Sequence, residues 1–199
     1  NIFNNNDIKY LKFDYVETFP ALLVSKMNDP LIKNLVNEMS KWKDDFIKYG
    51  INNIESEIYS FWIRKSHQPM LSIVAVKKNN NKIKYYRGVN LEVSIPTGSL
   101  CAERNAIGSA LSDDPSIKRC HFVGISVLGL PSMKPCNDIY YKTYNTNNAI
   151  NINDIENANP RGPCGSCTEW LKKLTASNPT LKIVTFQDLS LTKIIVRNL

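Results

Sequence analysis

The sequence lacks the features of membrane and secreted proteins. It contains no apolar run that approaches the roughly 20 residues of a membrane-spanning helix. Its first residues, NIFNNNDIKYLKF, have neither the basic start nor the apolar centre of a signal peptide. We therefore expect a soluble, cytoplasmic protein with no membrane partner. The 199 residues fit one domain, or one domain with an appendage, and suffice to bury a core without disulfide bonds.

Arginine is scarce in a chain that is otherwise basic. Only 6 of the 25 basic residues are arginines, although the formal net charge is +7. Residues 51–100 hold most of the excess, much of it in a cluster of Lys77, Lys78, Lys82, Lys84 and Arg87. Proteins that recognise phosphates and base edges rely on the planar guanidinium of arginine. We therefore interpret the cluster as a solvated, lysine-rich turn and keep a nucleic-acid-binding surface as the alternative.

The hydrophobic periodicity predicts an α/β protein. Asp29 is suited to cap a helix that has Pro30 in its first turn and ends at Gly50. Farther along, the pattern predicts helices at residues 99–111 and 164–175, and strands at residues 71–76, 82–91, 121–128, 181–186 and 193–196. This order predicts a three-layer α/β/α fold, in which helices cover both faces of a mixed central sheet of about five strands.

Residues 129–162 interrupt this pattern. The segment is rich in Pro, Asn and Tyr, and its 34 residues exceed the length of an ordinary connection. Two interpretations are open. The segment is either a lid or specificity loop, or a low-complexity expansion of the kind that Asn-rich sequences accumulate.

The cysteines are the strongest chemical signal. There are five of them, Cys101, Cys120, Cys136, Cys164 and Cys167. An odd number in a chain without a signal peptide favours a metal or catalytic role over a disulfide framework. The two-residue gap between Cys164 and Cys167 allows both sulfurs to bind one ion. This pair alone fits half a zinc site and a redox dithiol equally well.

Cys101 supplies the third thiol of a metal site that has one open position. It stands at the start of a predicted helix, as the Cys164 pair does, and helix N-termini favour thiolates. Three protein ligands leave the fourth tetrahedral position of a zinc ion to water, as in catalytic sites. Glu103, two residues after Cys101, is placed to exchange protons with that water. Cys-Ala-Glu followed by Pro-Cys-x-x-Cys is the pattern of the zinc deaminases.

With CAER at 101–104 and PCGSC at 163–167, the chain resembles the cytidine deaminase family. The likeness is to the free-nucleoside branch, whose first zinc ligand is typically Cys. The sequence GVNLE at 88–92 is similar to the family's ribose-recognition segment. In addition, Asn90 precedes Cys101 by eleven residues, which is the interval found in the family.

The resemblance implies zinc-dependent hydrolysis of cytidine or deoxycytidine to uridine or deoxyuridine and ammonia. It implies that Cys101, Cys164 and Cys167 bind Zn²⁺, which activates the water that attacks C4 of cytosine. Glu103 would take a proton from this water, deliver it to ring N3 and help the amino group to leave. Arg104 would offset part of the negative charge of the three thiolates.

The resemblance also implies the contacts with the substrate. Asn90 and Glu92 would bind the sugar hydroxyl, and the backbone of Ala102 would contact the edge of the base. Met70 stands near the position of the family's base-stacking aromatic residue, and methionine is apolar but has no ring. The tyrosines of the 129–162 segment are candidates for the missing ring.

The resemblance covers residues 67–199, which we therefore assign to a zinc domain with an inserted loop at 129–162. Residues 1–66 are expected to form an N-terminal helical extension packed on this core. Members of the family usually form tetramers whose neighbouring subunits complete each site. We therefore expect a homo-oligomer, either a dimer or a tetramer, that takes a small pyrimidine nucleoside.

Two other functions stay open on the sequence. One is deamination of a nucleic acid or a modified pyrimidine, with the lysine-rich hairpin as the binding surface. The other is a non-catalytic zinc-binding protein that uses the deaminase fold for contacts with other proteins. The presence of Glu103 argues against the second, because a structural zinc site does not need this carboxylate.

Overall fold

The structure is a computed structural model, which describes residues 21–53, 55–78, 82–93, 95, 98–131 and 159–197. Residues 1–20 lie outside the described residues, as do Cys136 and the tyrosines of the predicted insertion. Within the described part, no helix is long and apolar enough to cross a membrane.

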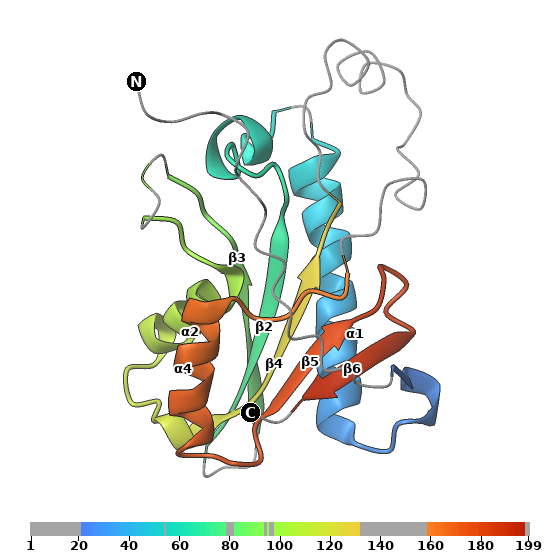
Figure 1. Ribbon diagram of the computed structural model, residues 1–199, viewed down its shortest axis with the longest axis vertical. Helices are drawn as coiled ribbons and strands as arrows, with labels where there is room; N and C mark the ends of the chain where they lie inside the picture. Colours follow the sequence, from blue (N-terminus) through green and yellow to red (C-terminus); the bar gives the residue numbers. More distant parts are fainter. Residues whose placement is uncertain are drawn as a thin grey trace, which may run out of the picture.

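The described chain folds into one six-stranded sheet with three main helices (Figure 1). The helices are α1 (Pro30–Phe46), α2 (Ala102–Asp113) and α4 (Gly165–Thr175). The strands are β1 (Leu22–Leu23), β2 (Met70–Lys77), β3 (Ile83–Val89), β4 (Phe122–Gly129), β5 (Lys182–Phe186) and β6 (Lys193–Arg197). Short helical turns are η1 (Val24–Lys26), η2 (Ile47–Ile51), η3 (Ile58–Trp62) and η4 (Arg119–His121).

The strands lie in the order β1-β6-β5-β4-β2-β3. β4 and β5 are parallel and every other neighbouring pair is antiparallel, so the sheet is mixed, as predicted. The sheet has one strand more than the sequence predicted. This strand is β1, whose two residues pair with Ile194 and Lys193 of β6 and extend the edge of the sheet.

Helices cover both faces of the sheet (Figure 1). α1 packs on one face, where Leu35 belongs to the same buried cluster as Ile73 of β2. α2 and α4 pack on the other face, where Ala106 and Leu171 share a buried cluster with Val74. Since consecutive side chains of a strand point to opposite faces, Ile73 and Val74 contribute to the two cores in turn. The arrangement confirms the three-layer α/β/α fold.

α1 begins where the sequence predicted. The Asp29 carboxylate accepts a hydrogen bond from the backbone N–H of Leu31 (2.9 Å), and Pro30 is the first helical residue. These are favourable residues for a helix start, because they satisfy or remove N–H groups that lack intrahelical partners. The regular helix ends at Phe46, and the wider turn η2 carries the chain on to Ile51.

α2 and α4 begin at the same end of the sheet. α2 leaves the end of β3, and α4 precedes β5, which runs parallel to β4. Both helices therefore start where β2 begins and β4 finishes (Figure 1). Gly88 of β3 permits α2 to pack closely there, because a Cβ at Gly88 would overlap the carbonyl oxygen of Ala102 and the backbone nitrogen of Ala106. This packing brings the first turns of the two helices together.

Candidate metal centre

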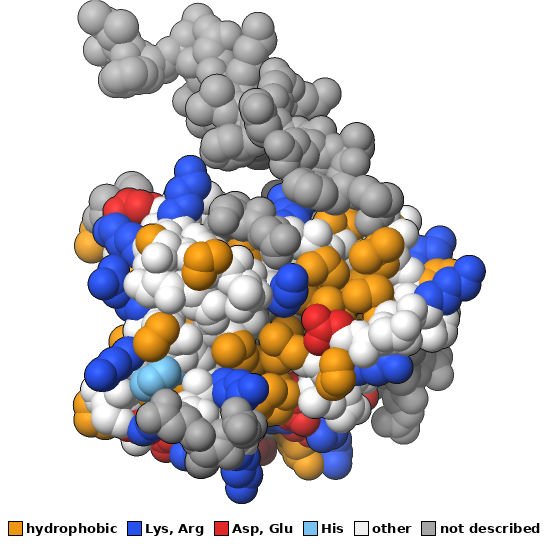
Figure 2. Space-filling view, turned by 90° about the horizontal axis from the view of Figure 1, so that it is seen from below, with side chains coloured by type: hydrophobic (Ala, Val, Ile, Leu, Met, Phe, Trp, Pro, Cys, Tyr) orange, Lys and Arg blue, Asp and Glu red, His pale blue; other side chains and the backbone are white. Residues whose placement is uncertain are grey.

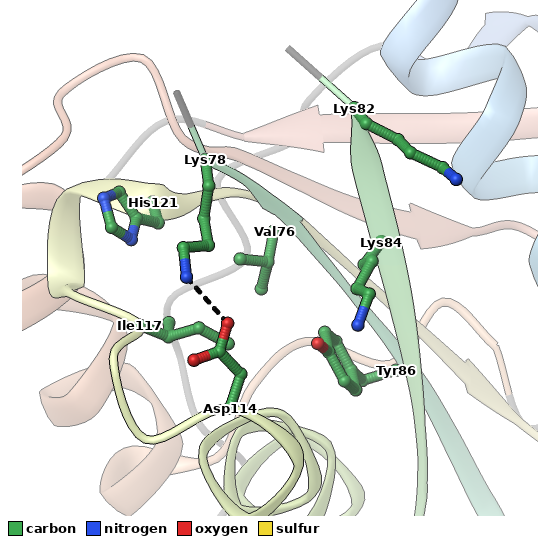
Figure 3. A pocket seen from close by; sticks show the side chains of 8 residues that line it. All are labelled: Val76, Lys78, Lys82, Lys84, Tyr86, Asp114, Ile117 and His121. Carbon is green, nitrogen blue, oxygen red and sulfur yellow. Dashed lines mark hydrogen bonds and ion pairs between the residues drawn. The ribbon is translucent and has the colours of Figure 1, made fainter. Parts of the chain in front are cut away.

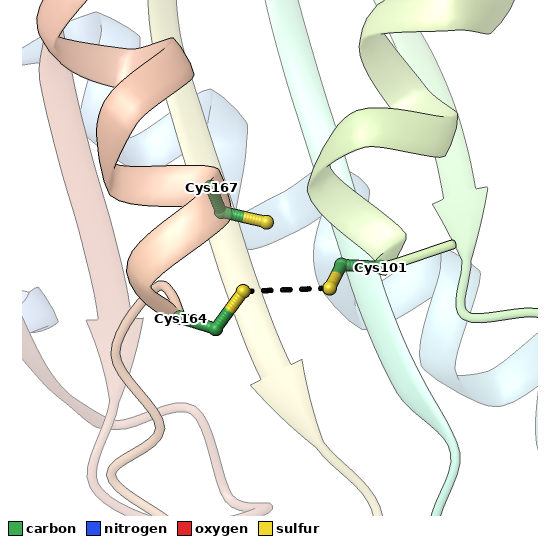
Figure 4. Close-up of side chains that lie close together, drawn as sticks. All are labelled: Cys101, Cys164 and Cys167. Atoms are coloured by element: carbon green, nitrogen blue, oxygen red, sulfur yellow. Dashed lines mark hydrogen bonds between the residues drawn. The ribbon is translucent and has the colours of Figure 1, made fainter. Parts of the chain in front are cut away.

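Three thiols meet between the N-termini of α2 and α4 (Figure 4). Cys101 and Cys164 occupy the N-cap positions of the two helices, and Cys167 lies in the first turn of α4. The three Sγ atoms lie within 4.8 Å of one another, and those of Cys101 and Cys164 are 3.5 Å apart. Neither N-cap thiol bonds a helix N–H. We call this end of the sheet the thiol end.

The donor set fits a zinc ion. Thiolates about 2.3 Å from one tetrahedral zinc lie roughly 3.8 Å from one another, which the spacing of Cys101, Cys164 and Cys167 approximates. A hydrogen bond from Cys167 is the main cause that lowers the pKa of the Cys101 thiol to about 5, and Arg104 adds to it. The same contact raises the pKa of Cys167. One thiol is therefore ready to bind a cation as the thiolate, and the cluster offers a soft, three-sulfur site.

Two charged side chains adjoin the thiols. Glu103, in the first turn of α2, is only 5% exposed, and this burial raises the pKa of its carboxyl group. The Arg104 guanidinium lies 3.7 Å from the Cys101 sulfur and donates to the carbonyl oxygen of Ser99 (3.0 Å). Hydrogen bonds from its own backbone N–H and from Cys167, together with the charge of Arg104, offset only part of this rise in the pKa of Glu103. A buried carboxyl group with a raised pKa beside a cluster of thiols is a candidate proton-exchanging group.

Asn90 and Glu92 lie at the thiol end, and their polar atoms bond to the turn that precedes β2. The Asn90 amide accepts from the N–H of Met70 (2.8 Å) and donates to the carbonyl oxygen of Gln68 (3.1 Å). The Glu92 carboxylate accepts from the N–H groups of Lys65 (2.7 Å) and Ser66 (2.9 Å) and from the Ser66 hydroxyl (2.5 Å). A sugar hydroxyl would have to share or displace these bonds.

The other two predicted substrate contacts also lie at the thiol end. Ala102 is fully buried as the first residue of α2. Met70 opens β2 opposite Gly129, and a Cβ placed on Gly129 would lie 3.3 Å from the Met70 sulfur and 3.1 Å from Arg161 Cγ. The Arg161 guanidinium in turn donates to the side chain of Gln68 (3.4 Å). Arg161 is thus a neighbour of Met70, three residues before Cys164.

Sequence reasoning missed Gly88, Arg161 and the turn at residues 65–66. A glycine inside a predicted strand is a recognised sign of close backbone approach, so Gly88 could have been found. Arg161 and the 65–66 turn carry no such sign, because their roles depend on contacts with residues far away in the chain.

The opposite end of the sheet, at the turn between β2 and β3, holds a cavity of about 410 Å³ (Figure 3). We call it the hairpin end. Its lining residues are Val76, Lys78, Lys82, Lys84, Tyr86, Asp114, Ile117 and His121. Lys78 pairs with Asp114 (2.8 Å), and Lys84 pairs with Asp113 (3.3 Å). Acidic side chains therefore offset much of the lysine charge that the sequence concentrates here.

Figure 2 views the molecule from the hairpin end. The visible Lys and Arg side chains are dispersed among apolar and uncharged ones and form no continuous basic surface. His121 also lines the cavity, and its Nδ1 accepts a hydrogen bond from the N–H of Lys118 (3.1 Å). Nothing among the described residues at this end resembles the convergence of groups at the thiol end.

Comparison with known families gives a match over most of the chain. The family model of the LmjF365940 subfamily CDD/CDA-like deaminase matches residues 30–157 and 141–199. No curated protein matches the chain.

Solved structures give weaker similarities. A cytidine deaminase from Burkholderia pseudomallei has 22% identity and a TM-score of 0.44, covering 67% of this chain and 77% of that one. One from Mycobacterium leprae has 18% identity and a TM-score of 0.41, covering 79% and 89%. One from Mycobacterium tuberculosis has 13% identity and a TM-score of 0.42, covering 78% and 85%. At these scores, the family assignment rests on the sequence match.

Proposed function

The chain belongs to the CDD/CDA-like deaminases, in the LmjF365940 subfamily, and we propose that it hydrolyses cytidine or deoxycytidine to uridine or deoxyuridine and ammonia, with zinc as cofactor. One observation supports this above all. Three thiols from two helix N-termini converge within 4.8 Å, and the buried Glu103 stands in the first turn of the same helix as Cys101. A structural zinc site has four protein ligands and needs no such carboxyl group.

The residues of the cluster have distinct roles in this proposal. Cys101, Cys164 and Cys167 would hold the zinc ion, which would supply a nucleophilic water for C4 of cytosine at neutral pH by lowering the pKa of that water. Glu103 accepts a proton from the attacking water and delivers it to ring N3. The carboxyl group then assists the transfer of a proton to the amino group, which leaves as ammonia. Water supplies the oxygen of the product, so the atoms balance.

The surrounding side chains position the reacting groups. Arg104 contacts the Cys101 sulfur and offsets part of the negative charge that three thiolates place on one divalent ion. The backbone of Ala102 would contact the edge of the base, and Met70 would lie against its face. Asn90 and Glu92 would adjoin the sugar, while holding the turn at residues 65–70.

The domain organisation is part of the proposal. We assign the zinc domain to residues 67–199, with an insertion at 129–162, and an N-terminal helical extension to residues 1–66. The packing of α1 on one face of the sheet agrees with the part of this proposal that places the N-terminal helix against the core. We also propose a homo-oligomer, a dimer or a tetramer, as the assembly.

The Glu103→Gln variant tests the proposed function. The amide keeps the size of the side chain but cannot accept the proton, so we expect ammonia release from cytidine or deoxycytidine to fall by about 10²- to 10⁴-fold. Zinc content, measured by elemental analysis, should stay at the parental level. Glu169→Gln is the matched control, since Glu169 is an exposed glutamate of α4 that pairs with Lys173.

Two results would contradict the proposal. Ammonia release at the parental rate in the Glu103→Gln variant would remove Glu103 from the chemistry. A zinc-loaded parent protein that releases no ammonia from any cytosine-containing substrate would indicate the non-catalytic zinc-binding protein instead.

A further inference from the structure

Two aromatic side chains are exposed at the thiol end. Phe61 and Trp62, the last residues of η3, are 50% and 44% exposed, and their rings pack edge to face with centroids 4.9 Å apart. The guanidinium of Arg64 lies over the Phe61 ring, 5.7 Å from its centroid. We call Phe61 and Trp62 the aromatic platform. Exposed aromatic rings that adjoin cations are the means by which proteins bind the bases of single-stranded nucleic acids.

Backbone pairing connects this platform to the metal centre. The carbonyl oxygen of Trp62 accepts a hydrogen bond from the N–H of Glu92 (2.9 Å). The preceding residue, Leu91, pairs with Leu100, which directly precedes Cys101. The backbone of Trp62 is therefore about two strand spacings, on the order of 10 Å, from that of Leu100. In Figure 1, η3 lies beyond the start of β2, at the end of the sheet where α2 and α4 begin.

The cations near the platform differ from those at the hairpin end in the acidic side chains around them. Lys65 and Arg161 are both exposed, and the Arg161 guanidinium contacts the neutral side chain of Gln68. Two acidic residues lie near them. Glu92 uses its carboxylate for three hydrogen bonds to the 65–66 turn, and Glu57 stands at the start of η3. At the hairpin end, by contrast, aspartates pair directly with two of the lysines.

The two side chains expected to recognise a free sugar hydroxyl are already bonded within the protein. The Asn90 amide bonds the backbone of Gln68 and Met70, and all three donors to Glu92 come from residues 65–66. A free 3′-hydroxyl would have to share or displace these bonds. A nucleotide within a strand has an esterified 3′-oxygen and makes no such demand.

We propose that the substrate cytosine is presented within a single-stranded nucleic acid, whose neighbouring base stacks on the aromatic platform and whose phosphates contact Lys65 and Arg161. The proposal rests on the proposed function and names its substrate class, since the reaction is the same for a cytidine or deoxycytidine residue within a strand. Stacking on Phe61 and Trp62 gives affinity without sequence recognition, because every base has a π face.

Binding of a labelled oligonucleotide of about 12 residues tests the platform. The zinc-loaded protein is titrated against oligodeoxycytidylate and against oligocytidylate, with fluorescence anisotropy as the readout, so that the two arms compare DNA with RNA. Phe61→Leu and Trp62→Leu keep apolar bulk but remove the ring. Each should weaken binding by between about fivefold and 150-fold, with circular dichroism to verify the fold.

Trp170→Leu is the matched control for the rings. Trp170 of α4 is 49% exposed and has Lys173 over its ring, but it is not part of the platform. Its replacement should leave the affinity unchanged. Equal losses in the Trp170 and platform variants would mean that exposed aromatic residues bind the strand indiscriminately, and would overturn the proposal.

The salt dependence of binding tests the cations. Each phosphate contact to a single strand contributes about 0.7 to the slope of log K against log salt concentration. Lys65→Gln and Arg161→Gln should each reduce the slope by about this amount, and Lys82→Gln, in the hairpin-end cavity, should leave it unchanged. A slope that depends on Lys82 and not on Lys65 would place the strand at the hairpin end and overturn the proposal.

The outcomes separate this inference from the proposed function. A protein that deaminates free cytidine but neither binds nor deaminates either oligonucleotide overturns the inference and leaves the function standing. A protein that binds strands through Phe61 and Trp62 but releases no ammonia overturns the function and upholds the binding platform. Release of ammonia from oligonucleotides that falls in the Phe61→Leu and Trp62→Leu variants supports both.

Discussion

The thiol end and the hairpin end of one sheet carry their polar groups in opposite ways. At the hairpin end, Lys78 and Lys84 pair with aspartates that are close to them in space, so the charges largely offset one another. At the thiol end, the sulfur atoms of three cysteines point toward one another. The sequence predicted this difference, since it favoured a solvated turn for the lysine cluster and placed the candidate chemistry at the cysteines.

Burial sharpens this difference. The Lys78 and Asp114 side chains are 40% and 27% exposed, so water screens their attraction and their pairing stabilises the fold little. Glu103, by contrast, is 5% exposed with no cation among its hydrogen-bonding partners, which opposes folding. A buried carboxyl group beside three metal-binding types of side chain therefore indicates a functional site more strongly than a cluster of exposed lysines does. Three predictions test this contrast, beginning with the largest expected effect.

Cys164→Ala should change the protein most. Cys164 is exposed, so its replacement leaves no cavity, but it removes one of the three proposed ligands. We expect the loss of one equivalent of zinc per chain. The free energy of unfolding should fall by about 2.7 kcal/mol or more when zinc exceeds its Kd a hundredfold, because metal that binds only the folded chain stabilises it. Elemental analysis and urea denaturation measure both effects.

Cys120→Ala is the control from the other end of the sheet. Cys120 lies in η4, next to the His121 of the hairpin-end cavity, and is likewise an exposed free cysteine. Its replacement should alter neither zinc content nor stability. Zinc loss in the Cys120 variant, or full retention in the Cys164 variant, would contradict the assignment of the ligands.

Gly88→Ala should have the next largest effect. A methyl group at Gly88 would overlap backbone atoms of Ala102 and Ala106, so α2 must shift and carry Cys101 with it. Overpacking of this kind costs about 1–3 kcal/mol, and we expect zinc affinity to fall as well. Thermal denaturation and a competitive zinc titration measure these changes.

Gly108→Ala, in α2, is the control variant and should raise the stability of the protein. Gly108 is exposed in the middle of α2, and a Cβ there would meet no atom within 4 Å. Alanine should therefore stabilise the protein by about 0.5–1 kcal/mol through its helix propensity. If both glycine variants lost zinc affinity equally, the close approach of β3 and α2 would not be what positions the metal centre.

Most of the fold could be predicted because its signals are local. The Asp29-Pro30 start of α1 and the alternation of β2 lie within short stretches of sequence, and the structure reproduces both. β1 could not be predicted, because its two residues form a strand only through pairing with β6 at the far end of the chain. The regular α1 ends at Phe46 and not at Gly50, because the wider turn η2 replaces the last helical turn.

The same division applies to the site. The spacing of the residues predicted the candidate site. Cys101 and Glu103 lie close together at the start of one predicted helix, and Cys164 and Cys167 at the start of another. The bonds from Glu92 to the 65–66 turn join residues 26 and 27 positions apart, and Arg161 reaches Gln68 across 93 positions. Sequence patterns carry no record of such contacts. The cysteine cluster was therefore foreseeable, and the bonds that tie Glu92 and Arg161 to the turn before β2 were not.

The smallest expected effect concerns the ion pair at the hairpin end. The hydrogen bond from Lys78 lowers the pKa of Asp114 below its usual 3.8, so the folded protein binds this proton less readily than the unfolded chain does. The stabilisation from the pair is therefore present above the usual pKa and is lost as the pH falls below it. We expect wild type to lose stability more steeply than Asp114→Asn between about pH 5 and pH 2, as read from urea midpoints.

Lys78→Met decides whether the pair causes this difference. In a Lys78→Met background, Asp114→Asn should alter the acid dependence less, with only the hydrogen bonds from the N–H and hydroxyl of Ser116 left to lower the pKa of Asp114. Added salt should also reduce the effect in wild type, because exposed charges are screened. Parallel acid curves for wild type and Asp114→Asn would show that Asp114 does not neutralise Lys78 in solution. The hairpin-end lysines would then be available to an anionic ligand, and the contrast between the two ends would rest on the cysteines alone.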